Sequence, residues 1–165
     1  MKSKNRIRYI AYSGVIAAVY VVMTYITNVF GLANGAIQCR FSEALCILPA
    51  FTPAAVPGLF IGCLLSNFLT GAPLPDVIFG SLATLIGAIG TYFLARKKIN
   101  VFTFPIPAIV SNTVIVPLVL KYAYHLEEAL WYFVVTVGLG EIISCGILGM
   151  MLYFCLKKYS KFMFR

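Results

Sequence analysis

Arg40, Glu43 and Glu141 are ionisable residues that stand inside long apolar stretches of this 165-residue chain. A charge at the centre of a bilayer costs about 2.5–3.5 kcal/mol on insertion scales, so each of these residues needs a partner or a role. Arg40 and Glu43 are three residues apart, which places them on one face if a helix begins near Gln38. They could form a structural ion pair that orients this helix, or they could present both charges to a ligand.

Glu141 lies in the segment "VGLGEIISCG", about 12 residues into the last apolar stretch and therefore near its middle. No basic residue stands within one helical turn of it. It is either protonated, or reached by Arg40, or satisfied by a ligand. One arginine and two glutamates leave one carboxylate without a cation. Such a site favours a cation or a rigid set of N–H donors over an anionic ligand.

Further polar residues extend this set. Asp76 follows "PLP" at the start of an apolar stretch, where it could cap a helix and complement its dipole or contact a ligand. Asparagine and glutamine side chains could bridge helices or bind the ligand, and Trp131 could belong to an interfacial aromatic belt or stack on a flat ligand. The predicted binding residues are Gln38, Arg40, Glu43, Asn67, Asp76, Asn112, Trp131 and Glu141.

The chain lacks the motifs of common catalytic sites. No GxxxxGK[ST], HExxH or GxSxG segment occurs, the five cysteines show no CxxC spacing, and His125 is the single histidine. We therefore expect no catalytic residues, no metal site and no cofactor. Any ATP hydrolysis that drives the protein would belong to separate subunits.

The composition indicates a membrane protein. Hydrophobic residues make up 61% of the chain and charged residues 11%, whereas a soluble domain has about 25% charged residues. We predict one all-α membrane domain, residues 1–165, with six transmembrane helices. Their approximate bounds are 9–30, 38–51, 54–70, 76–95, 101–123 and 129–156, and the second is short.

The net charge of +8 gathers in three clusters beside the ends of these helices, at residues 2–8, 96–98 and 157–165. This is the pattern of cytoplasmic loops and not of nucleic-acid binding. If the first two clusters are both cytoplasmic, an even number of spans separates them, which requires the short segment 38–51 to be a span. We therefore expect both termini in the cytoplasm and the protein in the cell membrane.

Small residues recur four apart on the first predicted helix, as Ser13 with Ala17 and Gly14 with Ala18. This spacing lets helix backbones approach closely. The pairs could pack within the protein or form a docking face for a separate membrane subunit. The loop "FGLANGAIQ" that follows could be a lid over the site or a plain connector.

The segments "IQCRFSEALCILPAFTPAAVPGLFIGCLLSNFLTG", "PLPDVIFGSLATLIGA" and "VGLGEI" resemble the QueT family of queuosine-precursor transporters. This resemblance implies a substrate-binding subunit of an energy-coupling factor (ECF) transporter, with six helices. It also implies capture of a 7-deazaguanine base from outside, such as queuine or the cyano or aminomethyl precursor. The implied partners are a shared transmembrane subunit, which docks on the small residues of the first helix, and two ATPases.

On this resemblance, Glu43 and Glu141 would divide two tasks, one accepting from the ring N–H donors and the other binding the amine of the ligand. Arg40 would orient Glu43 or contact the ring carbonyl, and Asn67 and Asn112 would complete the site. The alternative function is a stand-alone proton-coupled carrier for a small donor-rich or cationic solute, with Glu141 as the proton site. A non-transporting scaffold is a third possibility.

Overall fold

The computed structural model describes residues 2–31, 40–123 and 128–163, and every regular element within those ranges is helical. This confirms the all-α prediction. The elements are α1 (Lys2–Val29), η1 (Phe41–Ala50), α2 (Ala55–Leu69), α3 (Leu74–Arg96), η2 (Val101–Thr103), α4 (Ile106–Tyr122), α5 (Leu130–Glu141), η3 (Ile142–Leu148) and α6 (Gly149–Met163).

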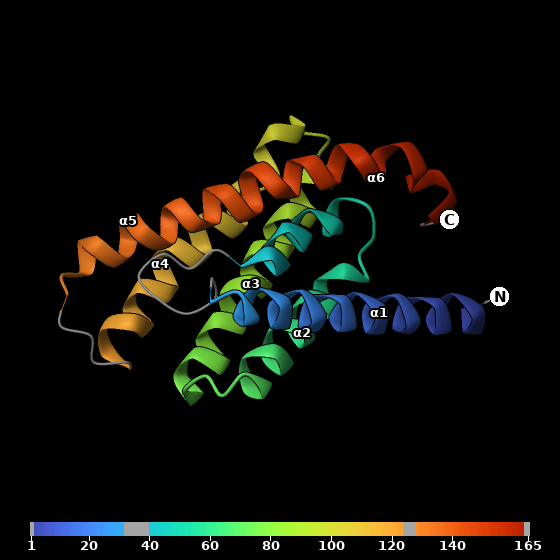
Figure 1. The fold of residues 1–165 in the computed structure, drawn as a ribbon. Coiled ribbons are helices and arrows are strands. Elements are labelled where there is room, and N and C mark those ends of the chain that lie inside the picture. The colour runs from blue at the N-terminus through green and yellow to red at the C-terminus, as the bar shows by residue number, and fades with distance from the viewer. Residues whose placement is uncertain (1, 32–39, 124–127, 164–165) are drawn as a thin grey trace.

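Four of these helical segments are long and apolar enough to cross a membrane: Lys4–Val29, Leu74–Arg96, Val101–Tyr122 and Leu130–Tyr159. The last is the rod formed by α5, η3 and α6, which Figure 1 shows as one continuous helix. The chain is therefore a multi-pass membrane protein. Helices η1 and α2 are apolar but shorter, so the count of six crossings stays a prediction.

The predicted second span is the 3₁₀-helix η1, which is shorter than the expected 38–51. All of its residues from Ser42 to Pro49 are buried, and it packs against α1, α2, α3, η3 and α6. Runs of 3₁₀-helix longer than three or four residues are uncommon; at a rise of about 2.0 Å per residue, ten residues extend about 20 Å. The protein itself, not lipid, surrounds this helix.

Small residues let α1 and α2 approach closely. A Cβ added at Gly58 would lie 2.8 Å from the Ser13 carbonyl oxygen, and one added at Gly62 would lie 2.7 Å from Tyr20 Cβ. The Ser13 hydroxyl also donates to the carbonyl of Ala54 at 2.9 Å. Ser13 therefore lies on the inward face of α1 and packs within the protein.

The other pair of small residues on α1 faces outward. Gly14 and Ala18 are exposed, and a Cβ added at Gly14 would meet no atom within 4 Å. The two overlapping pairs therefore lie on different faces of α1. Ser13 and Ala17 are buried in the protein's own packing, and Gly14 and Ala18 remain on the outer surface.

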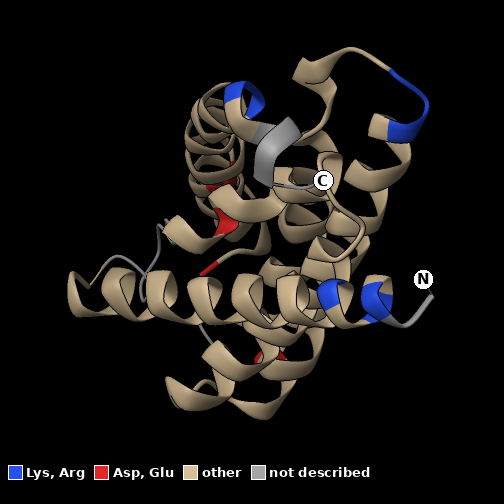
Figure 2. Cartoon of the chain, turned by 90° about the vertical axis from the view of Figure 1, so that its right-hand side faces the viewer, with Lys and Arg blue, Asp and Glu red and all other residues tan. Residues whose placement is uncertain are grey.

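The start of α1 and the end of α6 lie on the same side of the molecule (Figure 1). Figure 2 views that side and shows basic residues of α1, of α6 and of the connection after α3 gathered there. This arrangement is what the positive-inside pattern requires if that side faces the cytoplasm.

Candidate functional site

A small cavity opens between four elements at the centre of the helix bundle. The space inside it that no protein atom occupies is large enough for about one water molecule. The first residues of η1, the middle of α3, and the facing sides of α4 and α5 line it. The lining residues are Arg40, Glu43, Gly80, Thr84, Asn112, Val116, Val137 and Glu141.

The buried Glu43 carboxylate is held by neutral donors. One oxygen accepts from the hydroxyl of Tyr20 on α1, and the other lies 3.5 Å from the Asn112 amide nitrogen on α4. The inward face of α1 also fixes the start of η1, because the Thr24 hydroxyl donates to Ser42 at 2.9 Å. Thus α1 and α4 position Glu43 without supplying a positive charge.

Glu141 ends α5 where the helix widens into the π-helix η3, and it is buried. Single-turn π segments inside α-helices are frequent at functional sites. The Cys145 thiol lies 3.1 Å from the Glu141 carboxylate and 3.3 Å from the carbonyl oxygen of Glu43. Its one proton can serve one of these acceptors at a time. Cys145 therefore ties η3 to η1 at the level of both carboxylates.

The two carboxylates lie close together. A ligand atom of Glu43, one of Glu141 and the Cys145 sulfur all lie within 4.8 Å of one another. Two full negative charges at that separation repel by about 3.5 kcal/mol at an effective dielectric constant of 20. A proton or a cation between the two carboxylates would remove this repulsion. The distances between the three side chains would also allow them to bind a metal ion. Two carboxylates and one thiol do not favour one particular ion.

Arg40 lines the same cavity, but its ion pair is with Asp76. Its guanidinium lies 3.7 Å from the Asp76 carboxylate of α3 and donates to the Asn67 side-chain oxygen of α2 at 3.2 Å. Of the two alternatives for Arg40 and Glu43, the structure therefore does not show the structural ion pair, because the salt bridge it shows for Arg40 is with Asp76. Arg40 precedes η1 with extended backbone angles (φ −99°, ψ 113°), so it does not share the helical face of Glu43 on which that expectation rested.

Asn67 and Asp76, the two partners of Arg40, also lie against each other between α2 and α3. The Asn67 amide also lies 3.4 Å from the Asp76 carbonyl and so bridges α2 and α3. Asp76 lies in the first turn of α3, where its charge suits the helix dipole, but the N-cap is Pro73. A Cβ at Gly80 would lie 3.1 Å from Asp76 and 3.2 Å from Asn67, so a larger residue there would press on both side chains.

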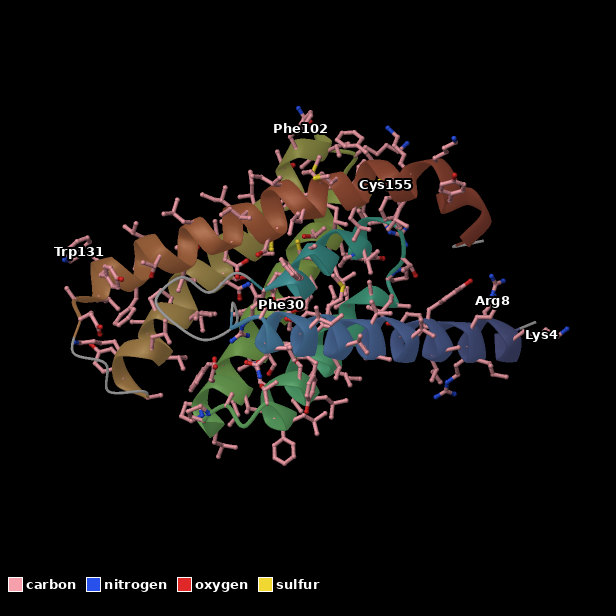
Figure 3. The ribbon with its side chains drawn as sticks, in the orientation of Figure 1. Lys4, Arg8, Phe30, Phe102, Trp131 and Cys155 are labelled. Atoms are coloured by element: carbon pink, nitrogen blue, oxygen red, sulfur yellow. The ribbon has the colours of Figure 1, made fainter. Side chains whose placement is uncertain are left out.

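Of the predicted residues that the structure describes, Trp131, Asn67 and Asp76 are not among those that line the cavity. Trp131 is 69% exposed at the beginning of α5 (Figure 3), a position typical of an interfacial tryptophan and not of a stacking partner in the cavity. Gln38 lies outside the described residues. The site thus brings together Arg40, Glu43, Asn112 and Glu141, with Asn67 and Asp76 directly behind Arg40.

Several residues at or beside the cavity were not predicted from the sequence: Tyr20, Gly80, Thr84, Val116, Val137 and Cys145. Two of them had a detectable signal. Tyr20 continues the inward face that Ser13 and Ala17 begin, and Cys145 stands one turn after Glu141. The valines carry no signal, because apolar residues surround them in the sequence.

A family model described as "QueT transporter" matches residues 10–158. The chain belongs to the QueT transporter family. It is similar to the "Queuosine precursor transporter QueT" of Lactococcus lactis subsp. cremoris (strain MG1363), with 35% identity over 89 residues. That alignment covers 53% of this chain and 52% of the relative, so it spans about half the length of each. No solved structure matches the chain.

Proposed function

We propose that this QueT family member is the membrane subunit that captures a queuosine precursor from outside the cell. The ligand would be a 7-deazaguanine base such as queuine or the cyano or aminomethyl precursor. The observation that carries the proposal is the pair of buried carboxylates, Glu43 and Glu141, at a cavity in the middle of a QueT family protein. The printed name of the Lactococcus lactis relative supports the same ligand class.

The chemistry of the cavity suits such a base. Its carboxylates accept hydrogen bonds from ring N–H, amino or ammonium groups, and the Arg40 guanidinium can donate to a ring carbonyl. Val116 and Val137 provide apolar walls for a flat ring. Since the free centre holds about one water molecule, side chains around it must move apart when a bicyclic ring enters.

In this proposal the protein is the non-catalytic, substrate-binding subunit of an ECF-type importer in the cell membrane, with both termini in the cytoplasm. A shared transmembrane subunit would dock on it, and two ATPase subunits would supply the energy. The exposed pair Gly14 and Ala18 supports such docking, because outward-facing small residues let a partner helix approach the backbone of α1.

Calorimetric titration of the purified protein with queuine and with the cyano and aminomethyl precursors tests ligand capture. We expect saturable binding of at least one base and much weaker binding in Glu141→Gln. The matched control is Glu128→Gln, the same change at an exposed residue, which should bind as the unmodified protein does. A folded protein that binds none of the three bases would refute the proposal.

A second assay addresses transport. In liposomes that contain this chain alone, we expect no accumulation of the base under a proton gradient, and accumulation only when the coupling and ATPase subunits are added with ATP. Uptake that follows the proton gradient and disappears in Glu141→Gln would instead establish the stand-alone proton-coupled carrier.

A further inference from the structure

The separation of Glu43 and Glu141 limits what they can bind. In a 7-deazaguanine the N–H donors of the pyrimidine edge and the substituent at position 7 lie on opposite sides of the bicyclic ring. Acceptors for both would be separated by the ring plus two hydrogen bonds of about 2.9 Å each. The two carboxylates approach within 4.8 Å, which is less than the two hydrogen bonds alone, so they cannot serve opposite ends of one base.

A single ammonium group fits this separation. Two oxygens that accept from one nitrogen at about 2.8 Å and a tetrahedral angle lie about 4.6 Å apart. An ammonium is also close to water in size, and the free centre of the cavity has room for about one water molecule. The amine of a ligand could therefore enter this space, while its ring would require the surrounding side chains to move.

The charges favour an ammonium over the neutral edge of the ring. Among the residues that the structure describes, the donors to the two carboxylates are Tyr20, Asn112 and Cys145, all uncharged groups. Arg40 is the cation among the residues that line the cavity, and its guanidinium lies 3.7 Å from the carboxylate of Asp76, with which it forms an ion pair. A pyrimidine edge offers N–H donors but no charge, whereas an ammonium brings both.

We propose that Glu43 and Glu141 together bind one cationic amine, so that the protein selects amine-bearing 7-deazaguanines over neutral ones. This inference rests on the proposed function and narrows its ligand class to bases such as the aminomethyl precursor and queuine. The edge of the ring is then left to other groups on the cavity wall.

An isosteric pair of ligands tests the inference on the unmodified protein. We would titrate it with 7-aminomethyl-7-deazaguanine and with 7-hydroxymethyl-7-deazaguanine, which replaces the ammonium by a hydroxyl of similar size. Loss of two charge-assisted hydrogen bonds should weaken binding about 100-fold or more. Unsubstituted 7-deazaguanine and the cyano base should bind as weakly as the hydroxymethyl compound.

Variants of the two glutamates show whether these residues cause the preference for the aminomethyl base. Glu43→Gln and Glu141→Gln should each reduce the preference for the aminomethyl base to about tenfold or less, and the exposed control Glu128→Gln should leave it unchanged. Equal affinity of the aminomethyl and hydroxymethyl bases would overturn the inference but leave ligand capture intact. Absence of binding by every base would overturn the proposed function itself. Because the ligand pair is compared on the unmodified chain, the test does not depend on the variants folding.

Discussion

The ion pair between Arg40 and Asp76 should be a large single contribution to the stability of the cavity wall. The charged atoms lie 3.7 Å apart, and the side chains are 15% and 4% exposed. At an effective dielectric constant of 20 their attraction is about 4.5 kcal/mol. Removing one partner of a buried pair leaves the other uncompensated and typically costs about 3–5 kcal/mol. We expect that loss of unfolding free energy in Asp76→Asn, which keeps the shape and removes the charge.

The buried cysteines provide the assay. Cys46, Cys63 and Cys145 are inaccessible in the folded protein, so a thiol-reactive fluorescent dye reports their exposure when detergent-purified protein is heated. A loss of about 3–5 kcal/mol corresponds to a fall in melting temperature of about 6–20 °C for a chain of this size. Ser81→Ala at another buried position of α3 is the control. In the described part of the chain the Ser81 hydroxyl bonds to carbonyls of its own helix, so this variant should change the melting temperature little.

The double replacement makes the prediction specific. A buried ion pair can often be exchanged for apolar residues of similar volume at little cost. Arg40→Met combined with Asp76→Leu should therefore melt at a higher temperature than either single variant. If Asp76→Asn melts within about 2 °C of the unmodified protein, or if the effects of the single variants simply add, the ion pair does not stabilise the wall and our reasoning fails.

Three further results are expected. Gly62→Ala should lower the melting temperature, because its Cβ would lie 2.7 Å from Tyr20 Cβ, whereas Gly14→Ala, with no atom within 4 Å, should not. Gly14→Leu should preserve ligand binding but weaken co-purification with the coupling subunit if α1 is the docking face; unchanged co-purification would place docking elsewhere. In a Cys39→Ser background, a small thiol reagent should modify the exposed Cys155 rapidly and the buried Cys145 only after unfolding, as mass spectrometry of labelled peptides can show.

The sequence was sufficient to predict the helical fold and the apolar segments, because composition and the length of apolar stretches determine both. It also identified Arg40, Glu43 and Glu141, since a charge in an apolar segment stands out whatever its partner is. The partner was not predictable. Whether Arg40 turns toward Glu43 or toward Asp76 depends on the extended backbone before η1 and on α3, which no spacing along the chain encodes.

The helix types were hidden for a related reason. The 3₁₀ geometry of η1 and the π geometry of η3 occur where these helices pack against each other beside the cavity, and both segments are short apolar runs with no spacing that distinguishes one helix type from another. The closeness of Glu43 and Glu141, nearly a hundred positions apart in the chain, follows from the packing of η1 against η3. For this reason the resemblance to the QueT family, taken without the structure, suggested two separate tasks for the two carboxylates.

The burial of η1 has a consequence for the way the chain enters the membrane during its synthesis. A helix that crosses the hydrocarbon core takes about 20 consecutive apolar residues, whereas η1 is ten residues long and includes the polar Ser42 and the ionisable Glu43. The surface of Ser42 to Pro49 is covered by α1, α2, α3 and the α5–α6 rod. The helix can therefore take its final place only after those neighbours have been inserted around it. The cavity is completed at the end of assembly, so ligand binding also reports that the chain has finished folding in the bilayer.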